Sequence, residues 1–272
     1  MDRKIWLSGA VAAFTVFSGG VIANETATTS LVSIAGQPAT ETKHDEKAIE
    51  ILDSYVEKIG GEKLIGSIES TKVTGTISVP MAGLSGTMTM QNKLPGMMSM
   101  VIEIAGFGKQ ESGYDGQVGW SSDPMSGPRL MTDEEIAGIA DQTDPTAALK
   151  YRELYPMIEY AGETNFEGSK AHKIKMVDET GKVQYQFYNI STGLMVGQES
   201  TEASPMGELN VIAVMSEYKE FGGMKMPTKI VQKMGPQQVI MEIKTAEMNN
   251  VDDSAFELPA AIQALVEASK DG

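Results

Sequence analysis

Residues 86–106 read "GTMTMQNKLPGMMSMVIEIAG", and apolar side chains fill every second position on both sides of a Leu94-Pro95-Gly96 corner. The alternating residues are Met88, Met90, Met98, Met100, Ile102 and Ile104. Successive side chains of a strand point to opposite faces, so this period predicts antiparallel strands with one buried face and one face in water. Proline followed by glycine is typical of a tight turn, which makes the corner a hairpin connection.

The same period of two covers most of the chain. "STKVTGTISVP" at 70–80 places Val73, Ile77 and Val79 on one face of a strand. We expect some four strands in the first half and about seven in the second. The second-half strands are predicted at 157–167, 170–178, 182–190, 193–201, 207–218, 228–234 and 237–248.

Four helices are predicted around these strands. The first begins after Asp45, a good N-cap, and ends at Gly60-Gly61. Two lie in mid-chain: one at 133–141 behind a Thr132/Glu135 capping box, and one at 145–155 with proline at its first position. A short helix at 259–270 closes the chain. The apolar face of the first helix comprises Ile49, Leu52, Tyr55, Val56 and Ile59.

The segment 113–131, "GYDGQVGWSSDPMSGPRLM", connects the first strands to the mid-chain helices. Asp115-Gly116 has the composition of a tight hairpin turn. We expect Trp120 to fill the base of the sheet and Asp123-Pro124 to turn the chain away from it. Gly127-Pro128 would limit the motion of this crossover.

The order of these features resembles the LolA-like lipoprotein-sorting and lipoprotein carrier superfamily. In that group a hairpin ends in Asp-Gly, a tryptophan follows, and an Asp-Pro or Asn-Pro turn precedes helices that cover the sheet. Asp115-Gly116, Trp120 and Asp123-Pro124 stand in this order here. The resemblance lies in the pattern of strands, turns and helices over most of residues 45–258. It implies a mainly β fold with helices (α+β) over 45–272: one incomplete, highly curved antiparallel β-barrel covered by mid-chain helices, like LolA and LolB.

The chain also departs from the family. The sorting factor uses a basic residue near its cavity, early in the sheet, and this chain offers only Lys72 and Lys93 there. Its acidic composition and its long leader differ as well. The resemblance therefore indicates a paralogue rather than the sorting factor itself.

The first residues predict export. Arg3 and Lys4 precede an uncharged run from Ile5 to Ala23, and Val21-Ile22-Ala23 offers a signal-peptidase site. We expect a signal peptide at 1–23 and a flexible leader at 24–44; an uncleaved anchor is the alternative. The chain has no cysteine, hence no lipid-carrying cysteine behind the signal. The prediction is a periplasmic or secreted protein.

Charge and motifs exclude several functions. A net charge of −15 repels phosphate backbones, so no nucleic-acid partner is expected. No nucleophile elbow, zinc-protease, P-loop or dinucleotide motif occurs in the mature chain, so we predict neither an enzyme nor a cofactor. His44 and His172 have no second histidine at ligand spacing, and we interpret both as structural, with no metal site.

Candidate ligand contacts follow from the predicted half-barrel. Trp120 is either core or a cavity residue, and Arg129 is either a surface residue or a guard of the cavity mouth. The methionine pairs are core, a lining for irregular apolar guests, or thioether ligands for Cu(I). The predicted cavity residues are Trp120, Met88, Met90, Met98, Met100, Ile102, Ile136, Ile139 and Leu149, with Ala140 and Leu154 also on the inward side of the helices.

The resemblance implies a non-enzymatic carrier or sensor that holds an acyl chain or other apolar ligand. The alternatives are an envelope protein-interaction module with the same fold and no lipid, and copper handling through methionine. Because the mid-chain helices bury little apolar surface, we expect them to open more readily than the sheet.

Overall fold

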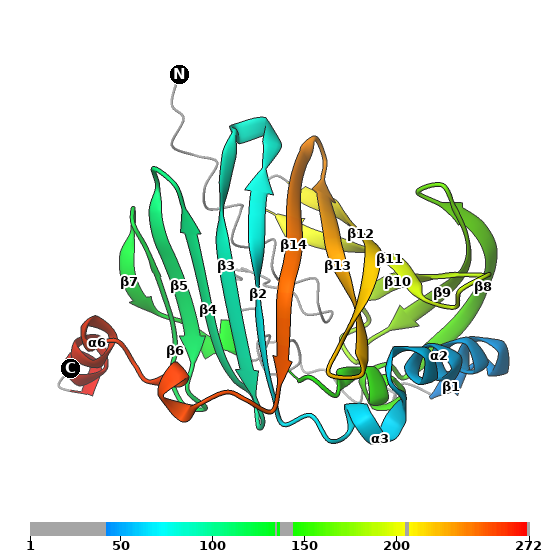
Figure 1. Ribbon diagram of the computed structural model, residues 1–272, viewed down its shortest axis with the longest axis horizontal. Coiled ribbons are helices and arrows are strands. Elements are labelled where there is room, and N and C mark those ends of the chain that lie inside the picture. The colour runs from blue at the N-terminus through cyan, green and yellow to red at the C-terminus, as the bar shows by residue number, and fades with distance from the viewer. Residues whose placement is uncertain (1–41, 134, 137–143, 205–206, 271–272) are drawn as a thin grey trace, which may run out of the picture.

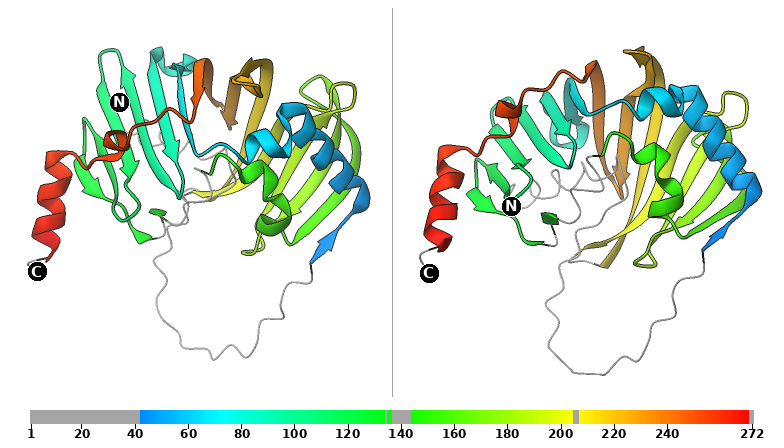
Figure 2. Two further views of the ribbon diagram at one scale, coloured as in Figure 1. Left: turned by 60° about the horizontal axis from the view of Figure 1, so that its bottom comes forward. Right: turned by 90° about the horizontal axis from the view of Figure 1, so that it is seen from below.

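The computed structural model describes residues 42–133, 135–136, 144–204 and 207–270. A 14-stranded sheet curls into an open half-barrel, seen from below in Figure 2. The predicted fold class, an incomplete and highly curved antiparallel barrel with few helices, is confirmed. The predicted signal peptide and residues 24–41 of the leader lie outside the described residues.

The strands shorten along the first half, from ten residues in β2 to four in β7, and the longest strand, β12, has 15 residues and lies in the second half (Figure 1). Their bounds are β1 Lys43–His44, β2 Ser70–Val79, β3 Leu84–Lys93, β4 Met97–Ile104, β5 Gly108–Tyr114, β6 Gly119–Asp123, β7 Gly127–Leu130, β8 Met157–Phe166, β9 Ser169–Val177, β10 Val183–Asn189, β11 Met195–Ser204, β12 Gly207–Phe221, β13 Met224–Met234 and β14 Gln237–Met248.

The two halves of the chain meet in the middle of the sheet. The strand order is β1-β8-β9-β10-β11-β12-β13-β14-β2-β3-β4-β5-β6-β7, so the last strand pairs with the first long one. Met241 lies opposite Ile77 in this antiparallel pair. Of the described strands only β1 pairs in parallel, with the start of β8, so the last two residues of the predicted leader are part of the sheet.

The described part of the first half contains seven strands, the two-residue β1 and β2 to β7, where we predicted about four. The Asp115-Gly116 turn joins β5 to β6 as predicted. Asp123-Pro124 does not turn the chain out of the sheet: Asp123 pairs with Gly127, and the Asp123 carboxylate accepts the Met125 and Ser126 N–H groups. The chain therefore runs one more strand, β7, whose Pro128 is tolerated because the strand lies at the sheet edge.

Helix α2, Glu46–Ile59, bridges the curl of the sheet. The Asp45 carboxylate accepts hydrogen bonds from Lys47 N at 2.9 Å and Ala48 N at 3.2 Å, the predicted N-cap. The helix contacts both β8 and β13, which are five places apart in the sheet. Its buried face anchors it there, and the short helix α3, Gly61–Ile65, follows directly.

The second mid-chain helix differs from the prediction. In place of one helix over 145–155, a 3-10 turn η3, Ala147–Leu149, precedes a single helical turn α5, Tyr151–Leu154. Asp144 accepts the Thr146 N–H at 2.7 Å and the Lys150 ammonium at 2.5 Å. These bonds hold a tight first turn, and the backbone of Lys150 (φ −98°, ψ 10°) interrupts the helix.

The remaining short elements lie at the ends of strands or beside the edge strand β7. The 3-10 turn η2, Pro80–Ala82, joins β2 to β3, and η4, Asp253–Phe256, contacts β4. The C-terminal helix α6, Ala260–Lys270, packs against β7 (Figure 1). It therefore lies beside the strand at one edge of the sheet, where an uncovered strand would expose unpaired backbone groups.

Candidate functional site

A cavity of about 240 Å³ is lined by strands of the sheet, by α2 and by the η3–α5 segment. The η3–α5 segment lies on the concave side of the curled sheet (Figure 2). The strands that line the cavity run from β9 to β3 in sheet order. The sheet curls here, so side chains that alternate toward one face converge on a common space. Helix α2 contributes Leu52, Tyr55, Val56 and Ile59 to its wall.

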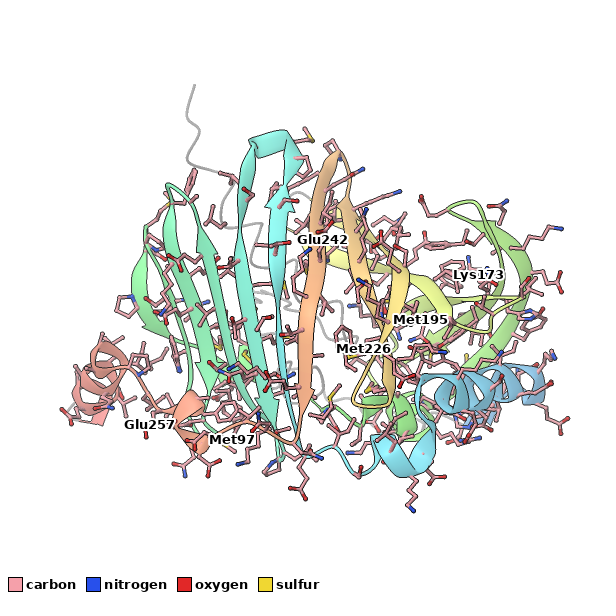
Figure 3. The ribbon with its side chains drawn as sticks, in the orientation of Figure 1. Met97, Lys173, Met195, Met226, Glu242 and Glu257 are labelled. Carbon is pink, nitrogen blue, oxygen red and sulfur yellow. The ribbon has the colours of Figure 1, made fainter. Side chains whose placement is uncertain are left out.

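Methionine dominates the lining. Met195 of β11 and Met226 of β13 are marked in Figure 3, near the end of the sheet that α2 covers. An unbranched thioether side chain changes shape easily and fits irregular apolar surfaces. The lining methionines are Met88, Met90, Met176, Met195, Met215, Met224, Met226, Met241 and Met248.

Tyrosines form the wall beneath α2. The rings of Tyr55 and Tyr188 meet edge to face, with centroids 5.2 Å apart. The Tyr188 hydroxyl donates to Gln186 Oε1 at 2.5 Å, and the Gln184 amide donates to the Tyr155 hydroxyl at 2.8 Å. Burial raises the pKa of Tyr55 to about 12 and raises the pKa of Tyr188 well above its ordinary value. These phenols are therefore neutral and act as hydrogen-bonding groups, not as bases.

Asp144 is the one charged side chain among the described residues that line the cavity. Burial raises its pKa, but the hydrogen bonds from Lys150 and Thr146 outweigh burial and hold the pKa below its ordinary value. The carboxylate is therefore ionised and already satisfied, with the Thr146 hydroxyl at 2.6 Å. Nothing in this arrangement activates it as a general base.

The structure places the predicted sheet residues in two groups. Met88 and Met90 line the cavity. Met98, Met100 and Ile102 lie farther along, on β4, in the apolar cluster that Met88 shares. Their contact with a ligand stays a prediction.

Trp120 is buried on β6, 6% exposed, away from the cavity lining. Its indole covers Gly113 on the neighbouring strand so closely that a Cβ at Gly113 would lie 2.7 Å from Trp120 Nε1. Gly113 thus leaves the space that the ring occupies. A role of Trp120 as structural support explains this packing, and a ligand contact stays a prediction.

The start of the first mid-chain helix is held beside β6. Thr132 Oγ1 accepts the Glu135 N–H at 3.3 Å and Glu135 Oε2 accepts the Thr132 N–H at 2.9 Å, which confirms the capping box. Arg129 donates two hydrogen bonds to Glu135, at 2.7 and 2.8 Å, so its guanidinium stabilises this turn. The position of Arg129 at the mouth of the cavity stays a prediction. Ile136 packs on Gly119. Ile139 and Ala140 lie outside the described residues.

The second mid-chain segment is anchored, contrary to the expectation that it buries little. Tyr151 and Tyr155 belong to the core cluster beneath α2, and Tyr151 donates to Asp53 at 2.5 Å. Leu154 lines the cavity, whereas Leu149 packs beside Val56 and Ile65 in a separate cluster.

Sequence reasoning missed the tyrosines and glutamines of the wall. A signal was present for Tyr55, which we placed on the apolar face of the first helix. In "VQYQFYN" the period of two puts Tyr188 on the same strand face as Gln184 and Gln186, a face that a polar pattern assigns to water, so the alternation did not indicate this part of the wall. Asn92 and Gln198 gave no signal, because a polar residue on a strand face is normally assigned to water.

No group of three or more acidic or histidine side chains in the described part of the chain is arranged to hold a metal ion. His44 contacts the Tyr155 carbonyl at 2.9 Å and His172 contacts the Tyr160 hydroxyl at 3.1 Å, so both have structural partners. Within the same residues no helix is long and apolar enough to cross a membrane.

Comparison with known proteins identifies the fold. No protein-family model matches the sequence, and no curated protein matches it. Among solved structures, the chain is similar to a DUF1329 family protein from Desulfovibrio piger, with 14% identity, a TM-score of 0.54, and 77% of this chain and 97% of that chain covered.

Two further solved structures are similar to the chain. A LolA superfamily protein from Nitrosomonas europaea has 14% identity, a TM-score of 0.53 and coverage of 78% and 97%. A putative outer membrane lipoprotein-sorting protein domain from Vibrio parahaemolyticus has 10% identity, a TM-score of 0.50 and coverage of 78% and 97%. The chain therefore has a LolA-like fold, as the sequence pattern predicted.

Proposed function

We propose that the protein is a non-enzymatic carrier or sensor that holds an acyl chain or another apolar ligand in the concave cavity. The observation that carries the proposal is the lining itself. Among the described lining residues, nine flexible thioether side chains, aliphatic side chains and neutral tyrosines surround one space, with a single carboxylate that is already paired. An apolar guest gains about 0.8 kcal/mol per buried CH₂, and methionine adapts to its shape.

The size of the cavity favours one chain over several. Sites for drug-sized ligands hold about 300–1,000 Å³, and this cavity of about 240 Å³ is slightly smaller. The predicted signal peptide and the LolA-like fold support action in the periplasm or outside the cell. A protein partner in the envelope would then deliver or receive the ligand.

Native mass spectrometry of the protein purified from its own envelope, followed by lipid extraction, tests the proposal. We expect a co-purifying lipid, and we expect the delipidated protein to bind an apolar fluorescent dye that lipid displaces. A clean apo mass, an intact fold and no dye binding would contradict the carrier function and favour the protein-interaction module.

Copper handling is the second candidate, because the concave side gathers so many thioethers, the ligand type that Cu(I) prefers. The aliphatic and tyrosine wall between them favours an apolar guest instead. We therefore expect no tight binding of Cu(I) in a competition assay. Strong stoichiometric binding that disappears when Met88, Met90, Met98 and Met100 become leucine would overturn the lipid interpretation.

A further inference from the structure

One buried side chain of the cavity lining makes no hydrogen bond. Gln198 of β11 is 5% exposed and lines the cavity, and its carboxamide has no hydrogen-bond partner among the described residues. Both polar atoms of this carboxamide keep accessible surface, because neither belongs to the polar atoms that are fully enclosed without a partner. A carboxamide in apolar surroundings destabilises the folded state unless it is hydrogen-bonded. Gln198 therefore presents an unsatisfied polar group to the cavity.

A second carboxamide lies directly opposite on the neighbouring strand. Gln186 of β10 is the cross-strand partner of Gln198 and also lines the cavity. Its Oε1 accepts a hydrogen bond from the Tyr188 hydroxyl at 2.5 Å, but its Nε2 donates to no described residue. Opposite side chains on one face of an antiparallel pair start about 4.5–5.5 Å apart, so one ligand group can reach both amides. Each amide nitrogen carries two N–H groups, and the pair thus offers more open donors than open acceptors.

The two carboxamides lie at the margin of the cavity. Across the sheet, Gln198 faces Ala213 on β12, and Ala213 faces Gln232 on β13. Neither Ala213 nor Gln232 belongs to the cavity lining. Met215 does belong to it, and it lies two residues along β12 from Ala213, on the same face of the strand. The methionine lining therefore ends at a row that carries two open carboxamides.

The charges of the lining exclude an anionic partner for these donors. No lysine or arginine is among the described lining residues, and their one charged side chain is the Asp144 carboxylate. A carboxylate or phosphate buried here would lose its hydration without gaining a cation, which is strongly unfavourable. The hydroxyls of Tyr188 and Tyr151 already donate to Gln186 and Asp53. The open amide donors consequently fit a neutral acceptor.

We propose that the ligand carries an uncharged carbonyl group at the head of an apolar chain, and that this carbonyl oxygen accepts hydrogen bonds from the amides of Gln198 and Gln186. The inference rests on the proposed carrier function and names the chemical class of its ligand, a neutral acyl derivative. The apolar chain lies along the methionines, and the carbonyl lies at the margin where the two carboxamides meet.

Three probes test the proposal on the delipidated mature protein. Diphenylhexatriene, a fluorescent hydrocarbon, has no hydrogen-bonding group and serves as the reference. Methyl decanoate and decanoate displace it; they share one acyl chain and differ at the head, which is a neutral ester or, at neutral pH, an anion. We expect methyl decanoate to bind tighter than decanoate, because only the anion loses its hydration without gaining a cation.

Two methionine variants locate the effect. Gln198→Met keeps an unbranched side chain of similar length and removes the amide. It should weaken binding of methyl decanoate about tenfold, the scale of one hydrogen bond to a buried group, and leave binding of the hydrocarbon dye unchanged. Gln232→Met is the matched control, because Gln232 is a glutamine of the same row, 1% exposed, and lies outside the lining. It should change neither affinity.

Infrared spectroscopy of bound, isotope-labelled methyl decanoate reports the hydrogen bond directly. A carbonyl that accepts hydrogen bonds has a weaker C=O bond, so its stretching band should lie at a lower wavenumber in the unmodified protein than in hexane. In Gln198→Met the band should move back toward its position in hexane. This measurement decides the point in the unmodified protein even where a variant does not fold.

The outcomes separate the two levels of the argument. The carbonyl proposal is wrong, and the carrier function stands, if Gln198→Met weakens the dye and the ester equally or weakens neither. The same conclusion follows if decanoate binds as tightly as the ester, or if the bound carbonyl absorbs where it does in hexane. If neither the dye nor the ester binds the unmodified protein, the carrier function itself fails.

Discussion

A larger side chain in the cavity wall should weaken ligand binding while leaving the stability of the fold nearly unchanged. Ala148, the middle residue of η3, lies in the cavity lining, and we expect a larger side chain at this position to enter the space. At about 30 Å³ per non-hydrogen atom, a cavity of about 240 Å³ holds about eight such atoms. The phenyl ring introduced by Ala148→Phe takes at least half of this room.

The loss of affinity follows from the methylenes that the ring displaces. Exclusion of about four CH₂ groups at about 0.8 kcal/mol each costs about 3 kcal/mol, which corresponds to a loss of about 200-fold in affinity. Thermal unfolding should change little, because the ring buries apolar surface in an existing space and creates no cavity. Displacement of an apolar dye and differential scanning calorimetry measure the two effects.

Ala82→Phe is the control for Ala148→Phe, since Ala82 is exposed in the turn η2 and remote from the cavity lining. It should leave affinity unchanged. If Ala148→Phe folds with normal stability and still binds the ligand as tightly as Ala82→Phe does, the ligand does not occupy this cavity. A large drop in unfolding temperature for Ala148→Phe would instead refute the claim that the space is free to accept a ring.

Three further predictions concern the elements around the cavity. Asp45→Ala removes the cap of α2 and should lower the free energy of unfolding by about 1 kcal/mol in urea titration, whereas Asp45→Asn should restore most of it; equal losses for both would contradict the cap. Burial raises the pKa of Tyr55 to about 12, above the ordinary value of about 10, so the folded state holds this proton more tightly than the unfolded state. The resulting stability is complete below pH about 10 and is lost as pH rises toward 12; Tyr55→Phe should make unfolding less pH-dependent in that window, and an unchanged profile would exclude Tyr55 as a cause. Amide exchange in 146–155 should be as slow as in α2, because Tyr151 and Tyr155 are buried in the same cluster, and exchange at the rate of an unstructured peptide would show that the segment is not anchored.

Local patterns in the sequence predicted the strands and the first helix because the causes are local. A period of two over 70–79 appears in the structure as alternating burial of Val73, Ile77 and Val79. The Asp45 cap and the Thr132/Glu135 box also depend on residues three positions apart or fewer. Such features need no knowledge of the rest of the chain.

The extra strand β7 shows where a local signal fails. Asp-Pro favours a turn whether the chain leaves the sheet or folds back along it, so the dipeptide alone cannot distinguish the two. The chain folds back along the sheet because Trp120 pairs with Leu130 and Asp123 pairs with Gly127. The break between η3 and α5 has a similar origin, because Asp144 binds Lys150 across the expected helix.

The set of residues that line the cavity could not be predicted from the sequence, because it depends on how far the sheet curls. Met176 and Asn92 belong to β9 and β3, strands that lie seven places apart in the sheet, and both line the same space. The period of two assigns each side chain to a face but does not reveal which faces meet. Hence the sequence placed Met88 and Met90 on one face of a strand but did not indicate the tyrosine wall.

This dispersed lining links ligand binding to the shape of the whole sheet. The wall draws on α2, η3, α5 and the strands from β9 to β3, so a ligand that touches it contacts elements distributed over most of the described chain. A ligand that binds only the curled state stabilises it by RT ln(1 + [L]/Kd), about 2.7 kcal/mol at a hundredfold excess over Kd. Because the contacts span β2 and β14, where the two halves of the chain pair, that stabilisation should reach the centre of the sheet. A ligand in the cavity therefore slows amide exchange on both sides of the β14–β2 junction, whereas a ligand bound at an edge strand protects only its neighbours.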